Sequence, residues 1–329
     1  MKNTKPKVRL WSVLTGLTAI LTVAAIVGNI IANQYATTIN VALNASTYKI
    51  IHGENTGDTE YFKKGFASDE EREAYEAELC ATVEAEGAAL LKNENNALPL
   101  ASGAKVSLFG HGSVDLMYGG TGSGSVDTSK APNLKQALEA QGITINQTLW
   151  DLYSSDSMMS KYSRLTPASI SDTLEANTQY AVNEAPWSAL SSAESSFAEY
   201  GDAAIVVLSR SGGEGADLPS GENGTSDSWI SGQEGDGNYL ALSAEEIELL
   251  KNLKALKDNG TFKNIVVLIN SSNAIELDFL NPEICGEDYG IDAAMWIGDV
   301  GQTGINGVAQ LLSGAVTPSG SLVDTYLND

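Results

Sequence analysis

Glu214 is the carboxylate in this chain whose neighbours best suit it to contact a ligand. It lies in the run Gly213-Glu214-Gly215-Ala216-Asp217, directly after the apolar segment 203–208, which has the composition of a buried strand. In open α/β sheets, ligands bind just beyond the carboxyl ends of the strands. Glycine adopts positive φ without strain and lets a substrate approach the main chain closely. Solvated connections often have a similar composition, so the rest of the chain has to support this interpretation.

A glycine-rich segment at 110–126 is the second candidate ligand loop. It follows the short strand-like run 106–109. Its Gly110-x-Gly112 start is not completed to the GxGxxG pattern of dinucleotide-binding loops, and no GxxxxGK[ST] occurs in the chain. A nucleotide is therefore the weaker alternative as the ligand of this loop.

The histidines and cysteines give no support for a catalytic metal. His52 and His111 are the only histidines, and Cys80 and Cys285 lie far apart. Neither HExxH nor CxxC occurs, and these are spacings that commonly bind zinc. The cysteines are predicted to be two small buried apolar residues or, alternatively, one disulfide. We expect no metal and no cofactor.

The charge balance excludes one class of partner. The 329 residues include 42 acidic and 19 basic ones, which gives a formal net charge of −23. Binding to a phosphate backbone depends on lysine and arginine, so nucleic acid is not expected as a partner. An acidic surface keeps a globular protein soluble without naming its substrate.

The N-terminus is predicted to span a membrane. Lys2, Lys5, Lys7 and Arg9 precede the stretch 10–32, which contains no charged residue. About 20 apolar residues cross a hydrocarbon core of about 30 Å. Basic residues before the span favour a cytoplasmic N-terminus and place the rest of the chain outside the cell. The alternative is a cleaved signal peptide and a secreted protein, although signal peptides have shorter apolar cores of about 7–15 residues.

Apolar runs and capping residues predict alternating helices and strands over the remaining chain. Ser68 and Glu71 form a capping-box pattern before a helix from Asp69 to about Asn93. The other expected helices are 133–140, an amphipathic stretch through 159, 189–200, 243–258 and 304–312, and the expected strands are 106–109, 143–145, 203–208, 265–269 and 293–297. This alternation predicts a three-layer α/β/α sandwich with a mostly parallel sheet.

Four regions follow from these patterns. Residues 1–33 form the basic tip and anchor, 34–67 a polar stalk, and 68–325 the α/β domain. Residues 326–329 are expected to begin a further region downstream.

Several motifs resemble, in order, the α/β sandwich domain of glycoside hydrolase family 3, the β-glucosidase and β-xylosidase type. They are Glu86-Gly87-Ala88-Ala89-Leu90-Leu91-Lys92-Asn93, Leu98-Pro99-Leu100, Gly119-Gly120-Thr121-Gly122-Ser123-Gly124, Val266-Val267-Leu268-Ile269-Asn270-Ser271, Ile275-Glu276-Leu277, and the stretch 296–320 with Gly301-Gln302 and Pro318-Ser319-Gly320. The resemblance covers about residues 80–325.

The resemblance implies that Glu214 is the general acid/base of a retaining glycosidase. Such a residue protonates the leaving oxygen and then activates water. It works best with a pKa raised toward the working pH, which a closing partner domain could achieve by desolvation. Glu222 and Glu234, in the same acidic loop 212–238, remain alternatives for this role.

A β-glycoside is the substrate that the resemblance implies. Gly120, Gly122 and Ser123 of the glycine-rich loop are then expected to bind it. Asp217 is expected to orient Arg210 or a sugar hydroxyl, and a surface ion pair is the alternative. The rings of Tyr118 and Trp229 are candidates to stack on the sugar, but packing or simple exposure is the favoured interpretation of both.

The family's second carboxylate is missing from this chain. The family carries its nucleophilic aspartate on a (β/α)8 barrel, in a short Ser-Asp-Trp-like motif. Asp227 in Thr225-Ser226-Asp227-Ser228-Trp229 has the wrong spacing and a loop setting, so we do not assign it. The barrel's Lys-His pair is also absent, and Gln302-Thr303-Gly304 replaces the usual Gln-Glu-Gly.

Two functional hypotheses follow. In the first, the chain is the front portion of an extracellular glycosidase with reversed domain order, and it needs a barrel in cis or in trans. In the second, it is a non-catalytic carbohydrate-binding or scaffold module. By either hypothesis, the isolated chain should hydrolyse glycosides poorly or not at all.

Overall fold

The computed structural model of the chain describes residues 5–43, 45, 65–120, 122–165, 181–214 and 239–326. The chain divides into two units, Met1–Gly65 and Phe66–Asp329. Each unit is described separately below.

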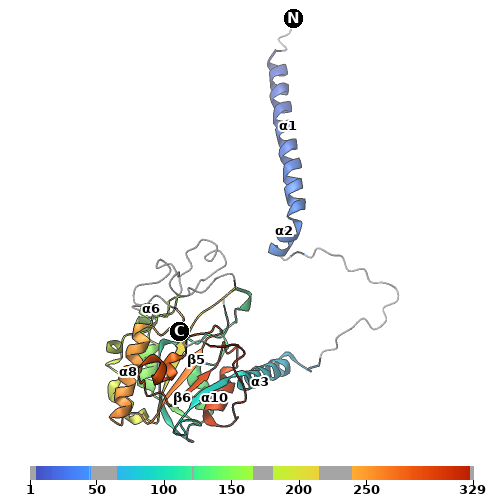
Figure 1. Cartoon of the computed structure of the whole chain (residues 1–329). Helices are drawn as coiled ribbons and strands as arrows, with labels where there is room; N and C mark the ends of the chain where they lie inside the picture. Colours follow the sequence, from blue (N-terminus) through green and yellow to red (C-terminus); the bar gives the residue numbers. More distant parts are fainter. Residues whose placement is uncertain are drawn as a thin grey trace. The chain divides into compact units, whose positions relative to one another are not determined.

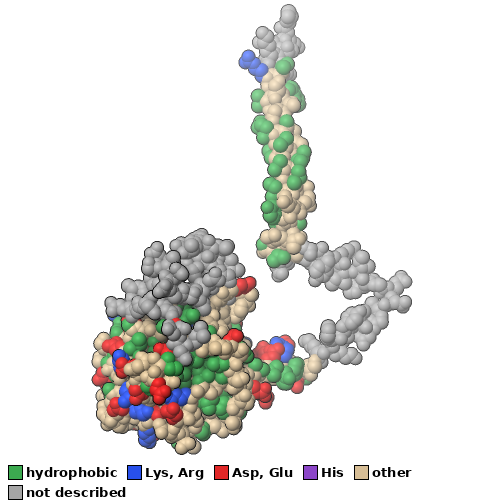
Figure 2. Space-filling model, in the orientation of Figure 1, with side chains coloured by type: hydrophobic (Ala, Val, Ile, Leu, Met, Phe, Trp, Pro, Cys, Tyr) green, Lys and Arg blue, Asp and Glu red, His purple; other side chains and the backbone are tan. Residues whose placement is uncertain are grey.

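The first unit contains one long apolar helix. Helix α1 runs over Lys5–Gln34, and the short α2 follows at Ala36–Ala42. Within α1, the 27 residues of Val8–Gln34 are long and apolar enough to cross a membrane. At 1.5 Å per residue they extend about 40 Å, more than a bilayer core requires. Their side chains are exposed throughout (Figure 2), as expected for a helix whose apolar surface faces lipid or another partner.

The second unit is built on a six-stranded sheet. Its strands are β1 (Ala89–Asn93), β2 (Lys105–Phe109), β3 (Thr144–Ile145), β4 (Ala203–Ser209), β5 (Ile265–Asn270) and β6 (Ala293–Trp296). They lie in the order β1-β6-β5-β4-β2-β3. The edge strand β1 is antiparallel to β6, and every other neighbouring pair is parallel. The predicted mostly parallel sheet is confirmed.

Helices cover both faces of this sheet (Figure 1). One face packs on α3 (Asp69–Gly87), α4 (Leu134–Ala140) and α10 (Ile305–Ser313). The other packs on α5 (Gln147–Tyr153), α6 (Asp156–Lys161), α8 (Ala244–Asp258) and the 3-10 helices η3 (Trp187–Leu190), η4 (Glu194–Tyr200) and η7 (Asp278–Leu280). Strand β4 is buried along its whole length, and its successive side chains alternate between the two cores. The three-layer sandwich is therefore confirmed.

The predicted helix over 69–93 is wrong in its last turns. Helix α3 ends at Gly87, Ala88 takes an extended conformation, and the next five residues form β1. Ala89 pairs with Trp296 and Asn93 with Ala293. The helix-forming residues in this segment thus form an edge strand because they make ladder hydrogen bonds with β6. This tertiary effect outweighs their local helix preference.

Other differences are smaller. The predicted helix over 189–200 is two 3-10 helices, η3 and η4. Ser68 caps α3 as predicted, but Glu71 accepts from the Ala67 N–H rather than from the cap residue. Both cysteines are free thiols and partly exposed, so neither the buried pair nor the disulfide describes them.

Candidate functional site

The carboxyl ends of β2, β4, β5 and β6 lie at the same edge of the sheet. A buried asparagine there makes hydrogen bonds to the loops that follow these strands. Asn270, the last residue of β5, is fully buried. Its Nδ2 donates to the carbonyl oxygens of Met117 at 3.0 Å and Gly298 at 2.7 Å. Its Oδ1 accepts from the Met117 N–H at 2.6 Å and from the Ser209 hydroxyl at 3.2 Å. The side chain therefore holds the glycine-rich loop, the end of β4 and the loop after β6 in one arrangement.

The structure brings Glu214 against the glycine-rich loop. Its Oε2 accepts hydrogen bonds from the Ser123 N–H at 2.9 Å and the Ser123 hydroxyl at 2.6 Å. Gly122 has φ +75°, and a Cβ there would lie only 2.8 Å from the Glu214 Cβ. A Cβ on Gly120 would lie 3.2 Å from the Gly212 carbonyl oxygen. Three predicted site residues, Gly120, Gly122 and Ser123, thus meet the loop that carries Glu214, and glycine permits the close approach.

The electrostatics of Glu214 differ from those expected of a general acid. The side chain is exposed. Hydrogen bonds from the Ser123 hydroxyl and N–H hold the pKa of this carboxyl below its usual range. Donors to a carboxylate favour its charged form, so the isolated chain holds Glu214 as a base. A raised pKa would require a change in this environment.

A buried ion pair anchors the base of the Glu214 loop. Arg210 is fully buried and makes a bidentate pair with Glu246 of α8, with both N···O distances 2.8 Å. Its remaining N–H groups donate to the carbonyl oxygens of Ser209, Tyr239 and Ala241. All five donors of the guanidinium therefore have acceptors, and the two ends of the segment between β4 and α8 are held together.

The predicted ligand residues Asp217 and Trp229 lie outside the described residues, as do the alternatives Glu222 and Glu234 and the rejected Asp227. Arg210, which Asp217 was expected to orient, already uses its donors on the groups named above.

Tyr118 lies within the glycine-rich loop, directly before Gly119, and its ring packs against the core. Its hydroxyl donates to the Pro132 carbonyl oxygen at 2.9 Å. Burial, with a smaller contribution from Asp115, raises the pKa of this phenol. The structure thus places the ring in a packing position, and its role in sugar binding stays a prediction.

A second polar cluster follows β2, and the sequence did not suggest it as a group. The buried His111 donates its backbone N–H to Glu184 Oε2 at 2.6 Å, and its Nε2 lies 3.1 Å from Asp115 Oδ2. Arg164 Nη2 lies 2.9 Å from the same Asp115 oxygen. Burial would raise the Asp115 pKa, but the His111 hydrogen bond and the Arg164 charge together lower it. The i, i+4 spacing of His111 and Asp115 was the one signal in the sequence.

Glu184 in this cluster is fully buried, and burial raises its pKa to about 7. The described parts of the chain hold no group of three or more histidine, cysteine or acidic side chains arranged to bind a metal ion.

Comparison with known proteins gives consistent matches over the second unit. Residues 88–329 match the model of the glycosyl hydrolase family 3 C-terminal domain. A β-glucosidase from Ruminococcus albus is 30% identical over 253 residues, which cover 77% of this chain and 23% of that protein.

Solved structures show the same likeness. The β-glucosidase from Paenibacillus barengoltzii has a TM-score of 0.57 and 27% identity, over 77% of this chain and 24% of that one. β-Glucosidase 3B from Thermotoga neapolitana, solved in complex with α-D-glucose, has a TM-score of 0.57 and 25% identity, over 80% of this chain and 32% of that one. The chain thus spans well under half the length of the relatives it matches.

Proposed function

The chain belongs to glycosyl hydrolase family 3 through the C-terminal domain that it carries, and from this premise we propose that it supplies the acid/base half of a retaining β-glycosidase. The second carboxylate is proposed to come from a (β/α)8 barrel, in cis or in trans. The supporting observation is the meeting of Glu214 with the glycine-rich loop at the carboxyl edge of the sheet.

In this proposal Glu214 performs two proton transfers. As an acid it gives a proton to the glycosidic oxygen while the nucleophile attacks the anomeric carbon from the other face. As a carboxylate it then takes a proton from the water that hydrolyses the glycosyl-enzyme. The nucleophile of a retaining enzyme lies about 5–5.5 Å from this group, so the barrel must close directly over Glu214.

Closure also accounts for how Glu214 could become an acid. In the described structure the carboxyl is exposed and Ser123 favours its charged form. A barrel and a bound sugar would remove water from the site, and desolvation raises the pKa of a carboxyl. A sugar hydroxyl competing for the Ser123 hydroxyl would act in the same direction. The proposed acid is therefore formed by assembly rather than present beforehand.

The cellular setting is part of the proposal. Within helix α1 the apolar stretch 10–32 follows Lys5, Lys7 and Arg9, which favours a cytoplasmic N-terminus. The α/β unit is then anchored outside the cell, where it would act on extracellular β-glycosides.

A non-catalytic binding or scaffold role is the competing function, and the hydrogen bonds of Glu214 are compatible with it. A carboxylate that binds the Ser123 N–H and hydroxyl also stabilises the glycine-rich loop. A carbohydrate-binding or scaffold module could use Glu214 in this way without proton transfer, and the tests below separate the two functions.

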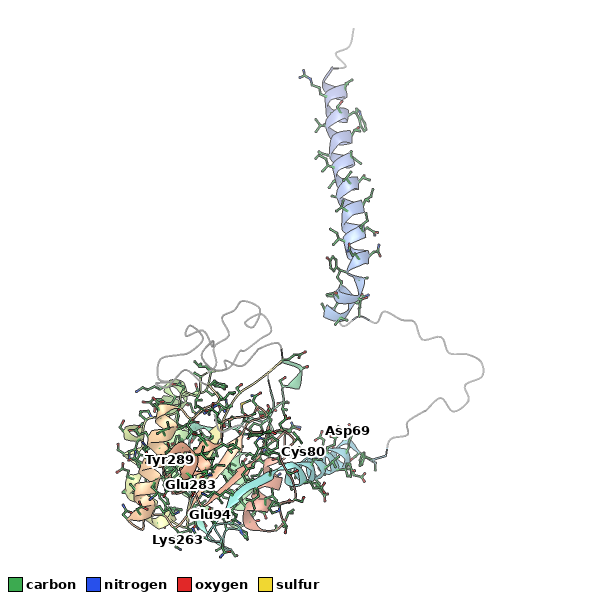
Figure 3. All side chains as sticks on the ribbon, viewed as in Figure 1. Asp69, Cys80, Glu94, Lys263, Glu283 and Tyr289 are labelled. Carbon is green, nitrogen blue, oxygen red and sulfur yellow. The ribbon has the colours of Figure 1, made fainter. Side chains whose placement is uncertain are left out.

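The test is turnover of an aryl β-glucoside by the gene product purified from its own cells. Glu214→Gln should lower turnover of a substrate with a poor leaving group by about 10²–10⁴-fold, the usual contribution of acid–base catalysis. Glu283→Gln changes another exposed glutamate, on the short helix α9 (Pro282–Cys285; Figure 3), and should leave turnover unchanged.

A second variant tests the role itself. With an aryl β-glucoside whose leaving group departs without an acid, azide should restore turnover to Glu214→Gly and form a glycosyl azide, because azide attacks the glycosyl-enzyme without needing a base. Equal turnover by the native protein and Glu214→Gln would overturn the acid/base assignment and favour the binding module.

A further inference from the structure

Most of helix α3 is exposed. Of its 19 residues only Ala81 and Ala85 are buried. Its outer end, at Asp69, extends away from the sheet, while Cys80 lies nearer to it (Figure 3). Helices in proteins are stabilised mainly by packing of an apolar face. A helix with so little of its surface covered suggests that another surface packs against it.

The exposed side of α3 carries an apolar stripe. Tyr75, Leu79 and Val83 follow one another at intervals of four residues and are 53%, 47% and 63% exposed. Residues at this spacing share one face of a helix. The Phe66 ring extends the stripe, with its centroid 5.2 Å from that of Tyr75. Figure 2 shows hydrophobic and acidic side chains together on this helix.

A groove of about 380 Å³ lies at the inner end of the stripe, between α3 and the loop after β6. Leu79 and Val83 line one side, and Val300 lies on the other. Two carboxyls reach it, from Glu84 and Asp299, and each has a buried oxygen without a hydrogen-bond partner within the described ranges. A buried acceptor left without a donor costs about 1–3 kcal/mol. The groove therefore combines apolar side chains with two carboxyls.

We propose that this surface, the α3 face formed by Phe66, Tyr75, Leu79, Val83, Glu84 and Asp299, docks the nucleophile-bearing domain of the same glycosidase. That domain is inferred to present apolar side chains to the stripe and basic side chains to the carboxylates of α3. The inference rests on the proposed function, because it names the domain that completes the Glu214 site.

Charge argues against two other occupants. Between Asp69 and Gly87 the chain has eight acidic residues and one arginine. A two-fold contact between copies would bring these carboxylates opposite one another, which is unfavourable. An anionic membrane surface attracts basic segments and not acidic ones. The complementary partner is a protein surface with basic side chains.

The α3 face is also continuous with the Glu214 site. The Val300 N–H donates to the Met117 carbonyl oxygen, and the Gly301 N–H to that of Tyr118. Met117 and Tyr118 belong to the glycine-rich loop that contacts Glu214. In the curated relatives the matched part is 23% and 28% of the protein, so a larger remainder accompanies this fold there. A domain docked on α3 would be adjacent to the site that it has to complete.

The test is photo-crosslinking within the gene product made in its own cells. Benzoylphenylalanine replaces Leu79 in one variant and Ile284 in the other, since these side chains are 47% and 49% exposed. Position 79 should form cross-links that peptide mapping assigns to a glycosidase barrel, and position 284 should form none. Tyr75 provides a second position on the stripe if the first variant fails to fold.

Cross-links from positions 75 and 79 only to residues 1–65 of this chain, only to a second copy, or to nothing would overturn the docking proposal. Turnover of the Glu214→Gln variant, measured in the same gene product, distinguishes failure of the docking proposal from failure of the acid/base assignment. Loss of turnover in Glu214→Gln with no barrel cross-link overturns the docking face alone. A barrel cross-link with full turnover in Glu214→Gln overturns the acid/base assignment and retains the docking face.

Discussion

At the residue scale, Ser123 is a hydrogen-bond donor to Glu214 that lowers the pKa of its carboxyl. One carboxylate oxygen accepts both the N–H and the hydroxyl of this serine. These donors lower the carboxyl pKa, whereas an acid catalyst needs a pKa near the working pH. Ser123 is therefore a predicted ligand residue, and under the proposed function its contact with Glu214 has to be partly released in the acid form.

Ser123→Ala should raise the Glu214 pKa in the isolated chain. The variant removes the hydroxyl donor and keeps the N–H donor, so the pKa should move toward its ordinary value without reaching it. Carbon-13 NMR of the labelled side-chain carboxyl measures this shift. Ser129→Ala is the control, because the Ser129 N–H bonds to Asp127 and not to Glu214. An unchanged Glu214 pKa in Ser123→Ala would contradict the observed contact.

Glu184 should make stability depend on pH. Its pKa is raised from 4.5 to about 7, chiefly by burial. Below 4.5 the carboxyl is protonated in the folded and unfolded states alike. Between 4.5 and 7 the folded state binds more protons, so the free energy of unfolding falls as pH rises, and above 7 this loss is complete. At about 1.4 kcal/mol per pKa unit, the loss is on the order of 3 kcal/mol.

Urea unfolding from pH 4 to 9 checks this prediction by comparing the native chain with Glu184→Gln. The variant cannot titrate at this position, so the difference between the two stability curves should change through the 4.5–7 window and stay flat above it. A constant difference across the whole range would show that Glu184 does not carry the pH dependence.

At the scale of elements, one buried pair joins β4 to α8. Arg210 and Glu246 are 0% and 2% exposed at their side chains. Glu246 also accepts the Ser243 N–H in the capping box that starts α8. The end of the strand that leads to Glu214 is thus fixed to the helix that follows the loop.

Arg210→Met should destabilise the unit by about 3–5 kcal/mol, because it leaves the Glu246 charge buried without a partner. The double variant Arg210→Met/Glu246→Leu should lose less, since it removes both charges. Chemical denaturation of the two variants measures this. Lys105→Met breaks a pair with Glu199 whose side chains are 46% and 64% exposed, and it should cost at most about 1 kcal/mol. Equal losses of stability on breaking the buried pair and the exposed pair would contradict the structural role given to Arg210 and Glu246.

At the scale of the whole molecule, the chain combines an apolar helical unit with an α/β unit. The apolar helix is predicted to be a retained anchor. Alkaline carbonate should therefore leave the full chain with the membrane, while a chain lacking residues 5–34 should be released.

N-terminal peptide mapping of the cellular product separates an anchor from a cleaved signal. Retention of peptides from residues 1–33 in the mature product supports the anchor. A mature N-terminus beyond residue 33 would show that the segment is a signal peptide and that the α/β unit is secreted.

Local patterns along the chain predict the fold class and the order of most elements. Apolar runs such as 265–269, and capping residues such as Ser243 with Glu246, predict local structure that the chain adopts. The glycine-rich motifs also indicated the family, which the comparison shows. These signals are readable because each depends on residues close together in the chain.

The tertiary structure alone decided where contacts join distant residues. Residues 89–93 became a strand because β6, about two hundred residues later, pairs with them. The low pKa of Glu214 depends on Ser123, 91 residues earlier, and the raised pKa of Glu184 depends on burial in the folded core. Periodicity and local propensity carry no information on such contacts, since pairing, burial and charge proximity arise only when the chain is folded.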